Sequence, residues 1–225
     1  MSLTANTAPP ICQPMRRLAA AVRLCLTLAF VSIVSAAPEA KAEGSALAFV
    51  QRVSDTAITD LTKPDISDSY RVKRMRKLLI DTFDAQEVAK FVLGLYSQRA
   101  TPAEFKEFLE LYEIYVAHNY AGLFKNYNSQ KVEMQRERVQ ANGEVFVFGV
   151  IHQVSGPDIN LELRVHKVGD TYKALDLKLE GISMPLTHRK QFASVLAQRG
   201  NKVSALNEAL KKATDRFEAE ASSTQ

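Results

Sequence analysis

The chain has 225 residues, and its 29 basic and 25 acidic side chains give a formal net charge of +4. A charge this close to balance does not favour the strongly basic class of nucleic-acid-binding proteins. Both cysteines, Cys12 and Cys25, lie near the N-terminus. A disulfide, a thiolate metal site or a cysteine nucleophile therefore depends on whether that segment is retained.

The first 42 residues have the organisation of a cleavable secretory signal peptide. Paired arginines at 16 and 17 and Arg23 precede the apolar run Leu24–Val34, which is too short to span a bilayer. Small residues follow, and the motif AKA at 40–42 predicts cleavage after Ala42. The alternative is an uncleaved anchor.

Cleavage at this position leaves 183 residues, an ordinary length for one domain with a sizeable core. It removes four basic residues and one acidic residue, so the net charge falls to +1. It also removes both cysteines and the chemistry that needs them. We predict a signal peptide at 1–42, a single domain at 43–218 and a polar tail at 219–225.

The first two helices are predicted over 45–61 and 67–83, where apolar residues recur at helical spacing. The second helix carries a basic run, which has two interpretations. It is either a solvated face or a docking surface for an acidic partner or for lipid phosphates. The docking candidates are Arg71, Lys73, Arg74, Arg76 and Lys77.

Two capping-box spacings predict the next helix starts, at Asp84–Glu87 and at Thr101–Glu104. Pro102 suits the first turn of the second of these helices. The stretch TPAEFKEFLELYEIYVAHNYAGLF at 101–124 has an apolar face that covers roughly 160° of the helix. A face this wide indicates either a deeply packed helix or one that also contacts a ligand.

After residue 128 the hydrophobic period changes from about 3.6 to 2, which predicts strands. KVEMQRERV, EVFVFGVIHQV, INLELRVHKV and TYKALDLKLE follow one another with turn signals at Asn142–Gly143, Gly156 and Gly169. We expect a four-stranded antiparallel meander with one wet face. Leu175, Leu177 and Leu179 should share the buried face, with Asp176 on the wet one.

Two closing helices are predicted, one ending near Gly200 and one that uses Val203, Leu206, Leu210 and Phe217. A helical half, an antiparallel sheet and closing helices make an α+β fold.

The sequence gives no support for catalysis. The four histidines at 118, 152, 166 and 188 have no metal-binding spacing, and neither a serine-nucleophile motif nor a phosphate loop is present. For Ser183 we expect a turn or capping role, and for each histidine a surface or hydrogen-bonded position. The prediction is a protein that is not an enzyme and that has no metal and no cofactor.

Three parts of the sequence together resemble the MlaC family, also called the toluene-tolerance auxiliary proteins. They are FVLGLYSQRATPAEFKEFLELYEIYVAHNYAGLFKNY at 91–127, the four predicted strands, and ALDLKLEGISMPLTHRKQFASVLAQRGNKVSALNEAL at 174–210. The most specific are LG-x-Y followed by ATP-x-E at 93–104, and EGISM followed by a helix with Thr, Arg and Phe at 180–192. The likeness runs from about Leu47 to Lys211. The segment FASVLAQRGNKVSAL is similar to the hopanoid-associated HpnM branch.

This resemblance implies a monomeric periplasmic carrier with sheet and helices around an apolar cavity. Such a carrier takes a phospholipid or a hopanoid-type lipid between an inner-membrane transporter complex and an outer-membrane complex, and breaks no bond. We expect the cavity to be lined by Phe91, Leu95, Phe108, Leu111, Tyr112, Tyr115, Phe124, Val147, Ile151, Leu161, Leu163, Leu175, Leu177 and Met184. The alternatives are a small-ligand enzyme on a half-barrel fold and a ligand-free periplasmic adaptor.

Overall fold

A computed structural model describes residues 44–125, 127 and 129–223. The predicted signal peptide and both cysteines lie outside the described residues. All described residues belong to one compact unit, Ala40–Gln225. Its helices are α1 (Ala46–Leu61), α2 (Asp68–Thr82), α3 (Ala85–Leu93), η1 (Gly94–Gln98), α4 (Pro102–Ala121), η2 (Gly122–Phe124), α5 (Met184–Gln198) and α6 (Val203–Ser223).

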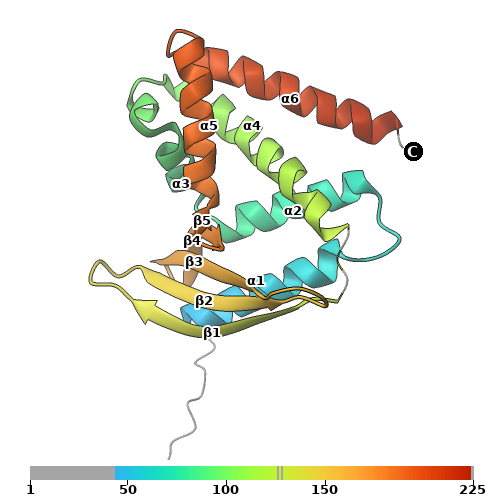
Figure 1. Ribbon diagram of the computed structural model, residues 1–225. Helices are drawn as coiled ribbons and strands as arrows, with labels where there is room; N and C mark the ends of the chain where they lie inside the picture. The colour runs from blue at the N-terminus through green and yellow to red at the C-terminus, as the bar shows by residue number, and fades with distance from the viewer. Residues whose placement is uncertain (1–43, 126, 128, 224–225) are drawn as a thin grey trace, which may run out of the picture. The chain divides into compact units, whose positions relative to one another are not determined.

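The strands form one antiparallel sheet in the order β1-β2-β3-β4-β5 (Figure 1). They are β1 (Lys131–Val139), β2 (Val145–His152), β3 (Ile159–Val168), β4 (Thr171–Leu179) and β5 (Ile182–Ser183). The predicted α+β meander is confirmed, with the two-residue strand β5 added beyond the four that were expected. Strand β5 pairs with the end of β4, where Leu179 lies opposite Ile182.

Helix α1 packs on one face of the sheet and contacts β1, β2 and β4. Phe49 and Val50 of this helix share a buried cluster with Val147, Leu163 and other core-face residues of the sheet. The N-terminus of α1 is held in two ways. Ser45 accepts a hydrogen bond from the Ala48 amide, and Glu137 of β1 accepts one from the Leu47 amide at 2.6 Å.

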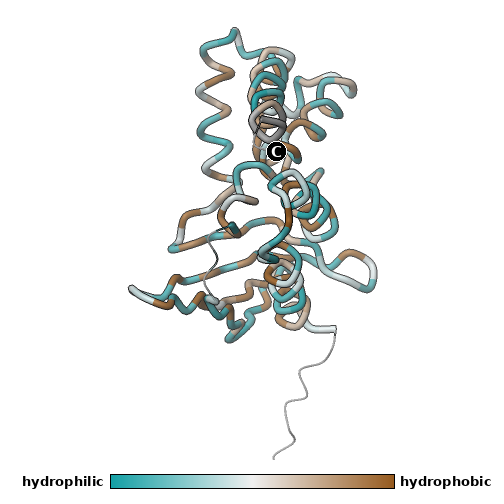
Figure 2. Tube along the Cα trace, turned by 90° about the vertical axis from the view of Figure 1, so that its right-hand side faces the viewer, coloured by the Kyte–Doolittle hydropathy of each residue, from teal (hydrophilic) through white to brown (hydrophobic). Residues whose placement is uncertain are grey.

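The remaining helices pack mainly on one another. Helix α4 contacts α2 and α6, and α3 contacts α5. Hydrophilic and hydrophobic residues both occur within single turns of these helices, as in amphipathic helices (Figure 2). Phe83, between α2 and α3, packs against both the sheet cluster and the cluster of α3 to α6. The amide of the next residue, Asp84, donates a hydrogen bond to the carbonyl of Ala174. Phe83 and Asp84 together therefore connect the helices to strand β4.

Strand β4 differs from its predicted alternation. The pairing of β3 with β4 shifts by one residue, so that Arg164 lies opposite Asp176 but Val165 lies opposite Ala174. The extra residue is Leu175, which forms a β-bulge. Ala174, Leu177 and Leu179 therefore belong to the core cluster, whereas Leu175 is outside it. The expectation that Leu175 shares the face of Leu177 is wrong.

Helix α6 extends to Ser223, into the predicted polar tail. Alanine and glutamate dominate the sequence EAEA at 218–221, and both are strong helix formers. Within the part of the chain that the structure describes, no helix is long and apolar enough to cross a membrane.

Candidate functional site

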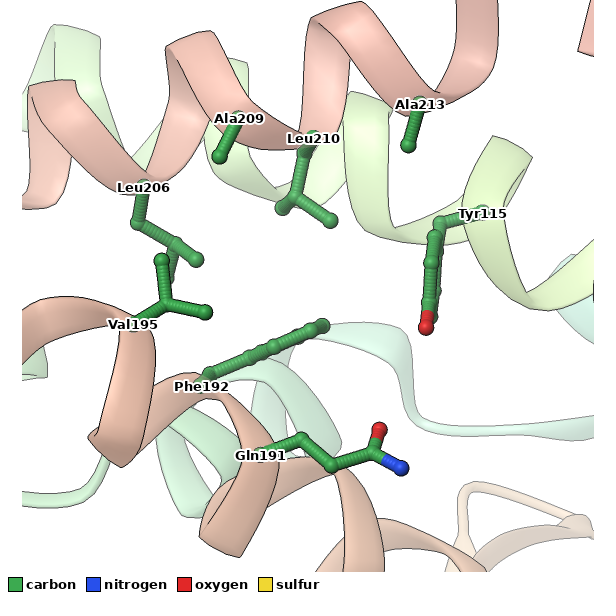
Figure 3. Close-up of a pocket in the computed structure, with 8 residues that line it drawn as sticks. All are labelled: Tyr115, Gln191, Phe192, Val195, Leu206, Ala209, Leu210 and Ala213. Atoms are coloured by element: carbon green, nitrogen blue, oxygen red, sulfur yellow. The ribbon is translucent and has the colours of Figure 1, made fainter. Parts of the chain in front are cut away.

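A pocket of about 260 Å³ lies between helices α4, α5 and α6 (Figure 3). Most of its walls are apolar, and Tyr115 and Gln191 bring the polar side-chain atoms seen there. The eight lining residues are Tyr115, Gln191, Phe192, Val195, Leu206, Ala209, Leu210 and Ala213.

The spacing of the residues on α6 explains why a space remains there. Leu206, Ala209, Leu210 and Ala213 follow one another at intervals of three, one and three residues, so they lie on one helix face. Two of the four are alanines, whose short side chains do not reach α5. The pocket therefore results from small residues on a face that otherwise packs with leucines.

Tyr115 and Phe192 separate the pocket from an aromatic cluster centred on His188. The imidazole of His188 stacks on Phe192 with ring centroids 6.0 Å apart and an interplanar angle of 15°. Tyr112 and Tyr115 meet the same imidazole edge to face, at 5.5 and 5.9 Å. One wall of the pocket is thus backed by closely packed rings that cannot shift independently.

His188 is buried and both of its ring nitrogens have a tyrosine partner. The Tyr112 hydroxyl lies 2.8 Å from Nδ1, and the Tyr120 hydroxyl lies 3.2 Å from Nε2. Burial lowers the pKa of His188 to about 4. Burial also raises the pKa of the Tyr112 phenol. The cluster is therefore uncharged at neutral pH, and one of the two imidazole nitrogens donates while the other accepts.

Asp176 is a second buried polar residue, at 8% exposure, and lies close enough to influence Tyr112. It was expected on the wet face of the sheet. The bulge at Leu175 and strand β5 explain the difference, because Ser183 covers Asp176 and donates a hydrogen bond to Oδ1 at 2.9 Å. Burial raises the pKa of the Asp176 carboxyl, although the Ser183 bond opposes that effect.

Ser183 has the capping role that the sequence predicted. Its oxygen accepts a hydrogen bond from the Leu186 amide at the start of α5. Because its hydroxyl hydrogen is directed at Asp176, Ser183 is not arranged as an activated nucleophile beside His188. Among the described residues, no group of three or more His, Cys, Asp or Glu side chains is placed to hold a metal ion.

The structure brings only one of the predicted lining residues, Tyr115, to this pocket. Several others are in the core. Phe108, Tyr112 and Leu111 belong to the cluster of α3 to α6. Val147, Leu161, Leu163 and Leu177 belong to the cluster between α1 and the sheet, and Phe124 packs beside α2 and α4. Ile151, Leu175 and Met184 are half-buried.

Phe91 and Leu95 lie at the surface instead, with exposures of 37% and 71%. The prediction missed the α5 and α6 residues of the pocket. A signal for them was present, because Ala209 and Ala213 recur four residues apart on an otherwise leucine-rich face.

The basic run on α2 is not one uniform docking surface. Arg71 is only 6% exposed, because its Nε donates to the carbonyl of Leu61 and its Nη1 contacts Asp68 at 2.7 Å. It joins α1 to α2 and is unavailable to a partner, so its assignment to docking is corrected. Arg74 pairs with Asp60, and Arg76 pairs with Glu113 of α4.

Lys73 and Lys77 remain exposed on this helix. Lys77 forms a salt bridge with Asp81 one turn later, at 2.6 Å.

A family model described as MlaC protein matches residues 51–212. The chain belongs to the MlaC family. The match includes every helix and strand from α2 to α5, and most of α1 and the start of α6.

Two individual proteins are similar to this MlaC-family chain. The toluene tolerance protein ttg2D of Pseudomonas putida is 21% identical over 128 residues, which are 56% of this chain and 60% of that protein. The chain thus aligns with less than two thirds of that relative. A phospholipid-binding protein from Ralstonia solanacearum, solved in complex with a phospholipid, is 22% identical with a TM-score of 0.69. The match covers 77% of this chain and 98% of that one, and it shows a shared fold.

Proposed function

We propose that this protein is a periplasmic lipid carrier that moves a lipid between membrane complexes without breaking a bond. The observation that carries the proposal is an apolar pocket between α4, α5 and α6 in a chain of the MlaC family. A pocket with mostly apolar walls and a few polar groups is the usual form of a ligand site. Here the Tyr115 hydroxyl and the Gln191 amide supply such groups.

The binding energy available to an acyl chain is sufficient for a carrier. Each methylene group removed from water contributes about 0.8 kcal/mol. Ten buried methylenes give about 8 kcal/mol before the costs of ordering the lipid are subtracted.

The pocket is smaller than a complete phospholipid needs. Pockets for drug-sized ligands have volumes of about 300–1,000 Å³, and this one has about 260 Å³. We therefore expect α6 to move away from α4 and α5 when cargo enters. That movement opens the pocket toward Leu111, Tyr112 and Phe108, which lie on α4 with Tyr115 and are among the predicted lining residues.

Phospholipid is the first candidate for the cargo, because the solved relative from Ralstonia solanacearum is described as phospholipid-binding. A hopanoid-type lipid is the second, on the resemblance of the segment at 192–206 to the HpnM branch. Both leave a polar head group near solvent while the apolar part is buried.

Docking to an inner-membrane transporter complex and to an outer-membrane complex is proposed for the exposed part of α2. Lys73 and Lys77 are the side chains that an acidic partner reaches there. In a transfer assay between membranes that contain those complexes, Lys73→Glu with Lys77→Glu should slow transfer and leave bound lipid in place. Unchanged transfer would show that these lysines are only solvated.

The carrier proposal is tested by native mass spectrometry with organic extraction of the lipid, on protein purified without detergent. The expected result is a stoichiometric lipid adduct, whose extracted mass distinguishes phospholipid from hopanoid. A clean apo mass that persists after incubation with liposomes and hopanoids would overturn the proposal. It would favour a ligand-free adaptor or an enzyme that acts on a small ligand.

A further inference from the structure

The surface formed by α3, η1, α5 and the turn after α5 is rich in cations and poor in acids. No Asp or Glu occurs from Val88 to Ala103 or from Gly181 to Asn207. With cations and no acids, these two segments carry a local excess of positive charge. The same segments contain the basic residues Lys90, Arg99, Arg189, Lys190, Arg199 and Lys202.

These two segments form one surface, which we call the α3–α5 face. Helices α3 and α5 pack side by side (Figure 1). The Arg189 guanidinium lies over the Phe91 ring, 5.1 Å from its centroid. Toward the other end of α5, the Tyr96 hydroxyl donates to Oδ1 of Asn201 at 2.6 Å.

The α3–α5 face also exposes large apolar side chains. Leu95 is 71% exposed, Ile182 66%, Leu186 41% and Phe91 37%. Phe91 and Leu95 are four residues apart, and Leu186 precedes Arg189 by one turn of α5. The surface therefore combines exposed apolar side chains with cations, as segments that lie in a membrane interface do.

The cations of this face are largely free of acidic partners. In the described part of the chain only Lys90 among them forms a salt bridge, with Glu87 at 2.7 Å. The nearby Glu104 carboxylate accepts from the Thr101 amide and hydroxyl in the α4 capping box. The guanidinium groups of Arg99 and Arg189 lie over the rings of Tyr96 and Phe91, and neither forms a salt bridge with a described acid.

From this arrangement we infer that the α3–α5 face binds directly to the surface of an anionic phospholipid bilayer. Leu95, Ile182 and Leu186 enter the boundary between head groups and acyl chains, and the cations contact lipid phosphates. Lysine and arginine near such a surface each add attraction that salt screens. An acidic protein would satisfy the cations equally well, but Leu95, Ile182 and Leu186 are exposed beside them, so the observations favour a membrane over an acidic protein.

The inference rests on the proposed carrier function for its purpose. Gln191 and Val195, which line the pocket, follow Arg189 and Lys190 on α5. A bilayer that binds the α3–α5 face therefore lies near the pocket, and lipid has a short path between the two.

The experiment is vesicle co-sedimentation with the purified chain, carrying the same N-terminus in every variant. One set of vesicles is phosphatidylcholine alone, and the other contains about 30% phosphatidylglycerol. We expect binding to the anionic vesicles, weakened by high salt, and at least tenfold weaker binding after Lys190→Glu with Lys202→Glu. The matched control, Lys106→Glu with Lys167→Glu, has the same change in charge at exposed lysines elsewhere and should stay within twofold of wild type.

A second pair of variants tests the apolar contribution. Leu95→Ser should weaken vesicle binding severalfold, whereas Val139→Ser, at a position on β1 that is 66% exposed, should not. Equal losses in both members of either pair, or no binding of wild type to anionic vesicles, would overturn the inference. If wild-type protein carries extracted lipid but does not bind vesicles, the carrier proposal stands and the membrane inference fails. An acidic protein would then be the partner to test for this face.

Discussion

The Tyr112 hydroxyl lies 2.8 Å from Nδ1 of His188, although the two residues are 76 positions apart. This hydrogen bond joins the middle of α4 to the first turns of α5 beneath the wall of the pocket. It holds a neutral imidazole in a position from which water is largely excluded. Charging that imidazole in the folded protein therefore costs free energy.

Acid should destabilise the fold through His188. Its pKa is about 4 in the folded protein, because burial disfavours the charged form, against 6.5 as the ordinary value. Between these two values the unfolded chain binds the extra proton at His188. The contribution of His188 to the free energy of unfolding is therefore complete above pH 6.5 and is lost as the pH drops toward 4. A difference of this size corresponds to about 3 kcal/mol. Urea unfolding at pH 7 and pH 4.5 measures it.

The variant His188→Gln should flatten this part of the pH dependence, because glutamine keeps hydrogen-bonding groups and does not titrate. His152→Gln, which removes an imidazole on the exposed end of β2, should not flatten it. An acid slope that is unchanged in His188→Gln would mean that other groups cause the loss of stability.

Ser183→Ala should cost more than the loss of an ordinary helix cap. The serine caps α5 and also donates to the buried Asp176. Loss of the cap costs about 0.5–2 kcal/mol, and an unsatisfied buried group costs about 1–3 kcal/mol more. Ser67→Ala removes a cap of α2 at an exposed position and should cost only about 1 kcal/mol. Equal free energies of unfolding in the two variants would show that the Asp176 bond contributes nothing.

Gly94→Ala should be destabilising for two separable reasons. Gly94 has a φ of +57°, and a Cβ there would lie 2.9 Å from Nη2 of Arg189. Gly94 combines this φ with a ψ of −126°, which side-chain-bearing residues rarely adopt, so the backbone strain alone costs about 1–3 kcal/mol. Displacing Arg189 from the Phe91 ring adds about 0.5–1 kcal/mol.

Gly143→Ala is a control for a positive φ without a clash, because that glycine has a φ of +83° and open space around it. Thermal denaturation should show that Arg189→Ala reduces the cost of Gly94→Ala and leaves the cost of Gly143→Ala unchanged. A cost of Gly94→Ala that is the same with and without Arg189 would exclude the clash.

Ala209→Phe should reduce the amount of lipid that copurifies with the protein. The added ring projects from α6 into the pocket, where Phe192 and Leu210 face it. Ala141→Phe places the same ring at an exposed position in the turn between β1 and β2 and should leave the lipid content unchanged. Extracted lipid per protein, with circular dichroism to confirm folding, is the measurement. Full occupancy in Ala209→Phe would place the cargo elsewhere.

Local signals in the sequence predicted much of the fold. Thr101 and Glu104 form the expected capping box, and Asp84 caps α3. Gly143 adopts the positive φ expected of the Asn142–Gly143 turn. These features depend on a few neighbouring residues, so a single sequence is enough to find them.

Other features depend on contacts between distant segments and were not predictable from local pattern. The bulge at Leu175 is a property of the pairing between β3 and β4, and it decides that Asp176 is buried. Arg71 reads as one more cation in a basic run until Leu61 and Asp68 are placed around it. The pocket likewise requires three helices, each of which looks like ordinary core by itself.

The hydrogen bond from the Leu47 amide to Glu137 spans 90 residues of sequence, and it has a consequence for the order of folding. Helix α1 is the first of the described elements along the chain, yet the strands that cover its apolar face extend to Leu179. Contacts of such long range form late, since a large loop has to close before they stabilise anything. We therefore expect the N-terminal helix to wait unpaired until about four fifths of the chain has emerged, and the sheet layer to assemble in one late step.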